Sequence, residues 1–450
     1  MIYKLIIITI AILTINYTNI IQIFAKAPVA KKSTDYPSKL LFDTLLHPGL
    51  KYSNILFGKR VNKISANILE FDLTNPELEL AVLKAKNNIS ELDKLHGIVN
   101  IADSSDGKLT LAAINGSFWK AYRNNPIGAC IIEGVVVEMN PYKEWTGIFF
   151  DSLSRPTIDN FKLSGKVKLH DGKIINLTSV NRRRDSAGIV LYNKYGGYVI
   201  PHVNDATIEK MISEAYLTLL SDSTFMADDS TEVEFDFEEF ERNIMTSARN
   251  EKLEGSILKA LIEYIDKPAI NRTVRGVVNY VDTGFVSIND NQTVLSLGYN
   301  LPPDILVYAG DTLEILFETD LYRETEFFHA VTATPRLVRG GNAAHEAYRE
   351  GSKSRRFING QLGRTAIGYN KDRTKLYLVT IDHSNRSAKK KGSSLGELAQ
   401  IMKQIGCYDA MNLDGGGSSV MVIDGKNIMA KSNPNASRKI SVGIGIRKKR

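Results

Sequence analysis

The sequence predicts a mixed α+β protein with a mostly antiparallel sheet core, flanking helices and a helical acidic insert. Three observations support this fold class. Short runs of alternating apolar residues recur between turn residues over most of the chain, as expected for half-buried strands. A central stretch, residues 205–268, has helical periodicity and an acidic composition. Near the C-terminus an amphipathic helix with a capping signal lies between two apolar strands.

The N-terminal segment has the features of a targeting sequence. Lys4 precedes the apolar run 5–13, and Ala25-Lys26-Ala27 resembles a cleavage site of the A-x-A type. We therefore expect residues 1–27 to be a signal peptide or, if they are not cleaved, an N-terminal anchor. Either outcome predicts a secreted, periplasmic or envelope-associated protein. Residues 28–55 are interpreted as a linker.

Residues 56–204 are predicted to form the N-terminal part of the main folded region. Alternating apolar residues indicate two strands within 62–85, with Asn75-Pro76-Glu77 as the turn between them. A further apolar strand, Leu109 to Ile114, ends at Asn115-Gly116. Short strands with Asp-Gly and Gly-Gly turns then continue to about residue 200.

The acidic insert, residues 205–268, differs from its surroundings. It carries 16 acidic and 6 basic residues, a net charge of −10, which leaves +17 for the rest of the chain. Helical periodicity is found from Met211 to Leu220 and from Glu251 to Ile265, where apolar residues recur four apart. The pattern predicts an accessory helical unit inserted into the sheet protein.

Residues 269–450 are predicted to form the C-terminal part of the same folded region. Leu376 to Ile381 is an apolar strand, and Ser394 opens a helix in which Glu397 completes a capping box. A second strand leads to Asp414. This strand–helix–strand unit predicts that Asp382 and Asp414, which follow the two strands, lie at one edge of a sheet.

The most informative motif is Asn412-Leu413-Asp414-Gly415-Gly416-Gly417-Ser418-Ser419. Asn412 and Asp414 share one strand face, because side chains two residues apart point the same way. Three glycines allow a ligand to approach the backbone closely. The motif is not a P-loop, since no lysine follows the glycines and the next element is predicted to be a strand. The alternative is a tight connection in which glycine only relieves crowding.

This motif resembles the signature of the phosphodiester glycosidase family. Weaker blocks follow in the family's order, and the resemblance runs from about residue 60 to the C-terminus except for the insert. The blocks are Ala113 to Trp119, Pro335 to Val338, Arg364 to Gly368, Leu378 to Asp382 and Ser394 to Ala399. Two positions depart from the family pattern: Ala333-Thr334 replaces a glycine pair, and His383 replaces a glycine.

The resemblance implies a secreted hydrolase that cleaves a sugar-1-phosphate linkage, and many bacterial members of the family are linked to cell-envelope polysaccharide. It implies that Asp414, Asp382 and Arg364 are catalytic: the carboxylates support an oxocarbenium-like state or activate water, and the guanidinium binds phosphate. The expected substrate-binding residues are Asn115, Gly116, Thr365, Asn412, Gly415, Gly416, Gly417 and Ser418.

Each assignment has a structural alternative. Arg364 could instead pair with a structural carboxylate, Asp414 could cap its own loop, and Asp382 could form a turn. Two other functions stay open: a non-catalytic protein that binds envelope polysaccharide, and a glycosidase acting on neutral sugars, which would not need Arg364.

Composition limits the partners and cofactors. With 43% hydrophobic and 24% charged residues the chain is typical of a globular protein. A basic body suits an anionic sugar phosphodiester or polysaccharide, and nothing resembles a nucleic-acid module. No cofactor is expected, with a divalent cation such as Ca²⁺ held by the two aspartates as the alternative. Cys130 and Cys407 lie in apolar contexts and are predicted to be buried free thiols rather than a disulfide.

Overall fold

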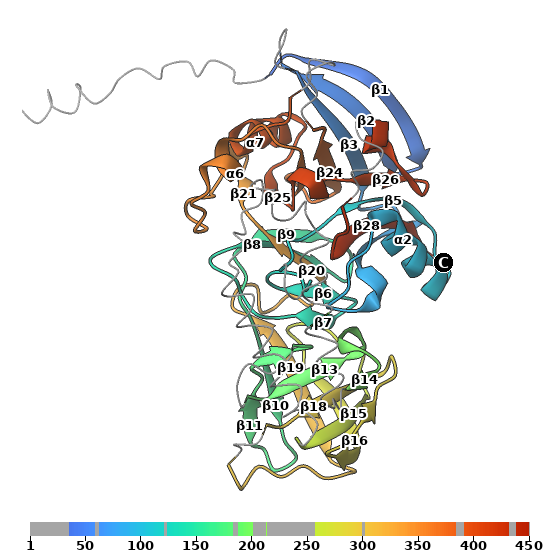
Figure 1. Ribbon diagram of the computed structural model, residues 1–450, viewed down its shortest axis with the longest axis vertical. Helices are drawn as coiled ribbons and strands as arrows, with labels where there is room; N and C mark the ends of the chain where they lie inside the picture. The colour runs from blue at the N-terminus through green and yellow to red at the C-terminus, as the bar shows by residue number, and fades with distance from the viewer. Residues whose placement is uncertain are drawn as a thin grey trace, which may run out of the picture. The chain divides into compact units, whose positions relative to one another are not determined.

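The computed structural model describes residues 36–58, 63–120, 124–182, 188–200, 213, 257–298, 302–383, 391–431 and 438–449 (Figure 1). Within these residues the protein is built mainly from β-strands in several sheets, with α-helices at α2, α6 and α7. The predicted α+β class is therefore wrong. Its antiparallel sheets are present, but they pack largely on one another, and the helices are too few and too short to flank them as a layer.

The largest sheet near the motif has eight strands and carries most of the predicted site. Its strands in spatial order are β1 (Ser38–His47), β2 (Leu50–Phe57), β3 (Ile64–Asp72), β24 (Lys375–Ile381), β23 (Arg364–Tyr369), β25 (Asp409–Asn412), β21 (Arg336–Arg339) and β22 (Asn342–Ala343). Helix α7 (Leu395–Gln404) packs against β21, β22, β23 and β25, and it also contacts α6 (Arg355–Asn359). The capping box that Ser394 and Glu397 predict is present at the start of α7.

A second sheet, of five strands, continues the chain on both sides of the glycine motif. Its order is β27 (Lys426–Asn427), β26 (Met421–Ile423), β5 (Thr110–Asn115), β28 (Val442–Lys448) and β4 (Leu78–Lys84). Helix α2 (Leu95–Asp106) covers it through contacts with β4, β5, β26 and β28. Because β25 lies in the first sheet and β26 in the second, the glycine loop is the crossing point between the two sheets.

The remaining strands form a five-stranded sheet, an eight-stranded sheet and a small pair. The five-stranded order is β7 (Val135–Glu138), β6 (Cys130–Ile132), β20 (Phe327–Ala333), β8 (Thr146–Asp151) and β9 (Pro156–Asp159). The eight-stranded order is β11 (Ile174–Asn176), β10 (Leu163–Lys168), β19 (Thr312–Thr319), β16 (Val274–Asp282), β15 (Lys259–Tyr264), β18 (Gln292–Ser296), β13 (Val190–Asn193) and β12 (Ser179–Val180). Strands β14 (Val199–Ile200) and β17 (Val286–Ser287) make the pair. Short 3-10 turns occur at η1 (Ala85–Asn87), η2 (Lys194–Gly196), η3 (Gly416–Ser418) and η4 (Ile428–Lys431).

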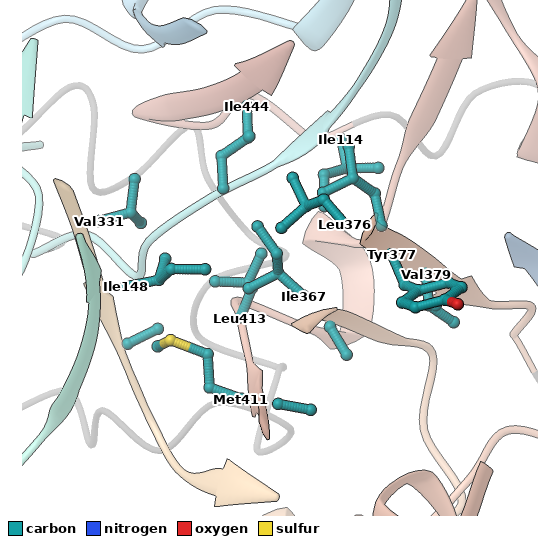
Figure 2. Packing of buried hydrophobic residues seen from close by; sticks show 14 of the residues in the cluster. Ile114, Ile148, Val331, Ile367, Leu376, Tyr377, Val379, Met411, Leu413 and Ile444 are labelled. Carbon is teal, nitrogen blue, oxygen red and sulfur yellow. The ribbon is translucent and has the colours of Figure 1, made fainter. Parts of the chain in front are cut away.

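One apolar core joins the sheets directly behind the motif. Figure 2 shows Ile114, Ile367 and Leu413, three fully buried side chains from β5, β23 and the end of β25, within this core. Ile148 and Val331 of the five-stranded sheet belong to the same cluster. Burying a side chain of this size contributes about 1.5–3 kcal/mol, so the core fixes the backbone just before the polar residues Asn115 and Asp414.

Two predicted segment boundaries do not match the described residues. The linker predicted for 28–55 is wrong from Ser38 onward, because Ser38–His47 and Leu50–Phe57 are paired strands. The helix predicted from Glu251 to Ile265 is wrong where it can be seen, because Lys259–Tyr264 forms β15 between β16 and β18. A short apolar run buried on both faces has no period that separates strand from helix. The part of the insert before residue 257, including the helix predicted from Met211, lies outside the described residues apart from Ser213.

Candidate active site

The polar residues of the predicted site gather at one edge of the eight-stranded sheet that contains β23. Strands β24 and β25 both pair antiparallel with β23, so the end of β24 lies beside Arg364 and the end of β25 lies beside Ala366. Asp382 follows β24 and Asp414 follows the end of β25. The expectation that both aspartates lie at one sheet edge is therefore confirmed. With β23 between them, the two strand ends are about 10 Å apart.

Asn115 is the centre of a buried hydrogen-bond cluster that joins the two sheets. Its Nδ2 donates to the main-chain oxygen of Asp414 at 2.7 Å. Its Oδ1 accepts from the hydroxyl of Thr365 at 2.7 Å and from the main-chain N–H of Val420 at 3.0 Å. The side chain is fully buried. Asn115 and Thr365, both predicted to bind substrate, thus position the glycine motif, and their role toward a ligand stays a prediction.

The glycine loop satisfies much of its own backbone. The N–H of Gly415 donates to Oδ1 of Asp414 at 2.8 Å, and the N–H of Gly416 donates to the oxygen of Gly363 at 2.9 Å. Gly416 has φ +56°, which favours glycine, and the loop turns through η3 into β26. Two of the three glycine N–H groups therefore already have protein acceptors. Fewer amides are left to bind phosphate than the sequence predicts. Gly417 is the partly exposed member of the loop.

Gly116 has a packing role as well as its predicted one. Its N–H donates to the oxygen of Val442 at 2.8 Å, and its own oxygen accepts from the N–H of Asp414 at 3.0 Å. A Cβ on Gly116 would lie 3.1 Å from both Cγ1 and O of Val442, which is closer than ordinary contact. A larger residue here would therefore push the β5 end away from the motif.

Arg364 is 1% exposed, and most of its N–H donors bond to main-chain oxygens. Nε donates to Ser393 at 2.9 Å, and Nη2 donates to Phe357 at 2.6 Å and to Gly360 at 3.1 Å. Burial lowers the pKa of this guanidinium to about 9, so it stays charged at neutral pH. Nη1 donates to none of the described residues, and it is the part of the fork left for an anion. A bidentate grip through Nε and Nη2 is excluded in this arrangement.

The side chain of Asp382 bonds to β3, the neighbour of β24 on the side away from β23. Its Oδ1 accepts from Nδ2 of Asn67 at 3.0 Å, and Asn67 lies on β3. Burial and then the charge of Asp382 raise the pKa of the Tyr52 phenol, whose hydroxyl donates to Oδ1 of Asn67. Strand β3 is on the far side of β24 from β25. The structure brings Asp382 to the same edge as Asp414, but the contact described here ties it to β3.

His383, the departure from the family pattern, lies over the backbone next to Arg364. A Cβ placed on Gly363 would be 2.8 Å from Cε1 and Nδ1 of the His383 ring. His383 is partly exposed, whereas Gly363 is buried. The imidazole therefore covers the start of β23, and only glycine at position 363 leaves room for it.

Several buried polar atoms around the motif lack a hydrogen-bond partner. Among the described residues, these atoms are Oγ of Ser117, Ser393, Ser418 and Ser419, Oδ1 of Asn412 and Nδ1 of His345. Buried polar groups are normally satisfied by protein, water or ligand, so each exception needs an explanation. Ser117 follows the β5 end, Ser393 accepts from Arg364 through its main chain, and Ser418 and Ser419 follow the glycines. Their concentration at the motif indicates a place where a polar ligand can bind.

Three residues of this region were missed by sequence reasoning. The buried carboxylate of Glu350 accepts from the hydroxyls of Thr334 and Thr146 at 2.8 and 2.7 Å and from the N–H of Arg336 at 2.7 Å. It thereby holds the cis Thr334-Pro335 bond, whose two main-chain oxygens accept from Asn412. Burial raises the pKa of Glu350. No motif marks Glu350, because its partners are far apart in sequence.

Ser393 and His345 are the other two. Arg364 contributes, after burial, to a lowered pKa of His345, which places this imidazole within electrostatic reach of the site. The only signal in the sequence for Ser393 was its place one residue before the helix cap. Neither Ser393 nor His345 belongs to a sequence motif that predicts a functional role.

The described residues offer neither a metal cluster nor a reactive thiol. Within them, no group of three or more His, Cys, Asp or Glu side chains is arranged to hold a metal ion. Cys130 and Cys407 are free and buried, as the sequence predicts. Burial, the larger effect, raises the pKa of the Cys130 thiol to about 12, which makes it a poor nucleophile. The searched helices include none that is long and apolar enough to cross a membrane.

Comparison with solved structures shows a shared fold. A hypothetical protein from Synechocystis aligns with a TM-score of 0.59 at 18% identity, covering 93% of this chain and 65% of its own. A protein from Burkholderia pseudomallei K96243 that is predicted to be exported aligns with a TM-score of 0.52 at 17% identity, covering 85% of this chain and 74% of its own. At these identities the likeness shows the fold alone.

Comparison of sequences finds a similarity in the C-terminal region. An N-acetylglucosamine-1-phosphodiester alpha-N-acetylglucosaminidase from Mus musculus is 31% identical over 98 residues, which are 20% of this chain and 18% of the mouse protein. The chain therefore matches less than a fifth of that relative's length. The phosphodiester glycosidase model matches residues 269–447, which include β23, β24, β25 and the glycine loop. Residues 269–447 are thus similar to the phosphodiester glycosidase family.

Proposed function

We propose that this protein hydrolyses a glycosyl phosphodiester at the bond between the anomeric carbon and the phosphate oxygen. The similarity to this family supports a hydrolase of this general kind. The observation that supports it most is the set of unsatisfied buried polar atoms around Asp414, since they provide donors and acceptors for a sugar without any protein partner. Asn412 and the serines after the glycine loop supply most of them.

The proposed reaction needs little acid catalysis. A phosphomonoester leaves as an anion, so the main requirements are charge stabilisation at the phosphate and at the sugar ring. Asp414 supplies the carboxylate that stabilises positive charge at the anomeric carbon or orients water. Nη1 of Arg364 supplies the positive donor for the departing phosphate. The C1–O bond breaks, water adds its oxygen to C1, one proton of that water stays on the new C1 hydroxyl, and the other ends on the phosphate.

Asp382 has a conditional role in this scheme. It lies about two strand spacings from Asp414, roughly 10 Å, with β23 between the two strand ends. A direct partnership requires that its side chain leave Asn67, with which it is bonded at 3.0 Å. We therefore assign the primary role to Asp414 and a supporting one to Asp382.

One observation favours a second candidate, a non-catalytic polysaccharide-binding protein. Asp414 is 3% exposed, and its Oδ1 accepts from the loop's own Gly415, as expected if it only caps the loop. We place the hydrolase first because a loop cap does not account for the unsatisfied atoms. The targeting pattern at the N-terminus supports the further proposal that the protein works outside the cytoplasm, on envelope or extracellular glycoconjugates.

The test is an activity panel with purified protein. A set of sugar-1-phosphodiesters that differ in the sugar and in the alcohol is incubated with the protein, and free sugar and phosphomonoester are measured together. Release of both products in equal amounts supports the hydrolase. Binding of the sugars without turnover of any of them supports the polysaccharide-binding protein, and turnover of aryl glycosides alone supports a neutral glycosidase.

A further inference from the structure

A cavity that opens to solvent lies at the opposite end of the sheet from the candidate active site. It has a volume of about 720 Å³, within the range of small-molecule sites. Its walls include the β3–β4 turn, the β8–β9 turn, the β23–β24 turn and the ends of β20 and β28. Arg364 begins β23 and the lining residue Asp372 follows its end, so the cavity lies roughly 20 Å along the strand from Arg364. None of the predicted site residues lines it.

Some of the cationic side chains that line this cavity form no ion pair with the described residues. Two lining pairs are already bonded: Lys108 with Glu79 at 2.5 Å, and Arg155 with Asp151 at 2.6 Å. Three further cations line the wall, and none of them forms an ion pair with another described residue. They are Lys267, Arg373 and Lys449.

Two of the three cations are positioned by aromatic rings rather than by carboxylates. Nζ of Lys267 lies 5.6 Å from the centre of the Phe328 ring, itself part of the lining. Arg373 lies over Tyr369 at 5.7 Å and donates to the hydroxyl of Thr157 at 3.3 Å. Exposed cations in such places keep their charge available for an anionic ligand.

His329 adds a neutral donor to the wall. The N–H of Glu133 donates to Nδ1 of His329 at 3.3 Å, so Nδ1 is the acceptor and the ring proton is on Nε2. Burial lowers the pKa of this imidazole to about 4, with Lys108 and Lys267 acting in the same direction and Glu79 against it. At neutral pH the imidazole is therefore uncharged and contributes an N–H donor instead of a further positive charge.

Apolar and acceptor groups complete the lining. Leu73, Leu153 and Phe328 give apolar surface, and the carboxylates of Glu133 and Asp372 have no ion-pair partner among the described residues. Such a mixture matches a saccharide, whose hydroxyls donate to carboxylates and whose C–H faces pack on apolar side chains. The unpaired cations match a phosphate or carboxylate on that saccharide.

We propose that this cavity is a second binding site, separate from the glycosidase site, for a small anionic sugar such as a sugar phosphate or a uronate. The choice of a saccharide rests on the proposed function, whereas the preference for an anion rests on the cavity alone. A site of this kind would hold an anionic unit of a longer glycan, or a released product, while the motif acts elsewhere.

The test is isothermal titration calorimetry of the full chain with glucose 6-phosphate, glucuronate, glucose and inorganic phosphate. We expect the two anionic sugars to bind at least about tenfold more tightly than glucose, as for the loss of a charge-assisted contact. Lys267→Gln and His329→Phe should each weaken that binding by at least about tenfold. Lys94→Gln, an exposed lysine outside the cavity, is the matched control and should bind as the wild type does.

The outcomes separate this proposal from the glycosidase proposal. Equal binding by Lys267→Gln and wild type, or no binding of either anionic sugar at millimolar concentration, would overturn it. Loss of binding in Arg364→Lys but not in Lys267→Gln would place the anion at the candidate active site instead, and would also overturn it. Inorganic phosphate binding as tightly as glucose 6-phosphate would remove the saccharide part. Hydrolysis of a phosphodiester is a separate readout that none of these results decides.

Discussion

Replacing Asn115 with alanine should lower the free energy of unfolding more than any other single change to a polar residue of the motif. The substitution removes one donor and one acceptor, and it leaves the oxygen of Asp414, the hydroxyl of Thr365 and the N–H of Val420 without their buried partner. Each lost bond costs about 1 kcal/mol, and more when the remaining group stays buried and unpaired. Three such bonds give an expected loss of about 3–5 kcal/mol in the free energy of unfolding.

The assay is equilibrium unfolding in urea, followed by circular dichroism, with the midpoint and the slope both fitted. We expect a lower midpoint at an unchanged slope, which reports stability rather than a change in compactness. Thr365→Val should cost about 1 kcal/mol, because it breaks only one of the three bonds. Asn279→Ala is the surface control: Asn279 is exposed and its Nδ2 bonds Glu263, so its loss should stay within about 0.5 kcal/mol. A loss below about 1 kcal/mol for Asn115→Ala would refute the view that this residue holds the two sheets together.

Four further predictions concern charge and catalysis. Asp414→Asn should abolish hydrolysis but leave the thermal midpoint nearly unchanged, because the amide oxygen can still accept from Gly415; activity within a few-fold of wild type would remove Asp414 from the mechanism. Arg364→Lys should lower kcat/KM for a phosphodiester at least about tenfold and affect an aryl glycoside of the same sugar far less, and equal losses would assign Arg364 to the fold. Dialysis against EDTA should leave activity intact, whereas recovery only on adding Ca²⁺ would establish a metal site at the aspartates. The folded state holds the pKa of His329 at about 4 against an ordinary value near 6.5, so the stability that the neutral imidazole contributes is present above pH 6.5 and is lost as the pH falls toward 4. Relative to His329→Gln, the wild-type free energy of unfolding should therefore fall by at most about 3 kcal/mol between pH 6.5 and pH 4. Parallel curves of unfolding free energy against pH for the two proteins would contradict the lowered pKa.

Local signals in the sequence were reliable where one short segment decides the structure. The capping box of Ser394 and Glu397 is present, because both partners lie within one helical turn. The turn at Asn75-Pro76-Glu77 separates β3 from β4 as expected. In contrast, Lys259–Tyr264 is a strand although its apolar residues also fit a helix, since pairing with β16 and β18 overrides local periodicity.

The candidate site divides in the same way. The motif and the common sheet edge of Asp382 and Asp414 were predictable, because the two strands of a strand–helix–strand unit run in the same direction. The partners of Arg364 were not, since Phe357, Gly360 and Ser393 use main-chain oxygens that no residue type reveals. A segment labelled as a linker from composition, Ser38–His47, forms an edge strand because β2 offers it a free edge to pair with.

The most direct test of the central claim is hydrolysis of an N-acetylglucosamine-1-phosphodiester in water enriched with ¹⁸O, followed by mass spectrometry of both products. Our account predicts cleavage between the anomeric carbon and oxygen, so the label should appear in the hydroxyl at C1 of the released sugar and be absent from the phosphomonoester. It also predicts that Asp414→Asn releases neither product. Label found in the phosphate would mean attack at phosphorus, and it would contradict the assignment of this site as a phosphodiester glycosidase.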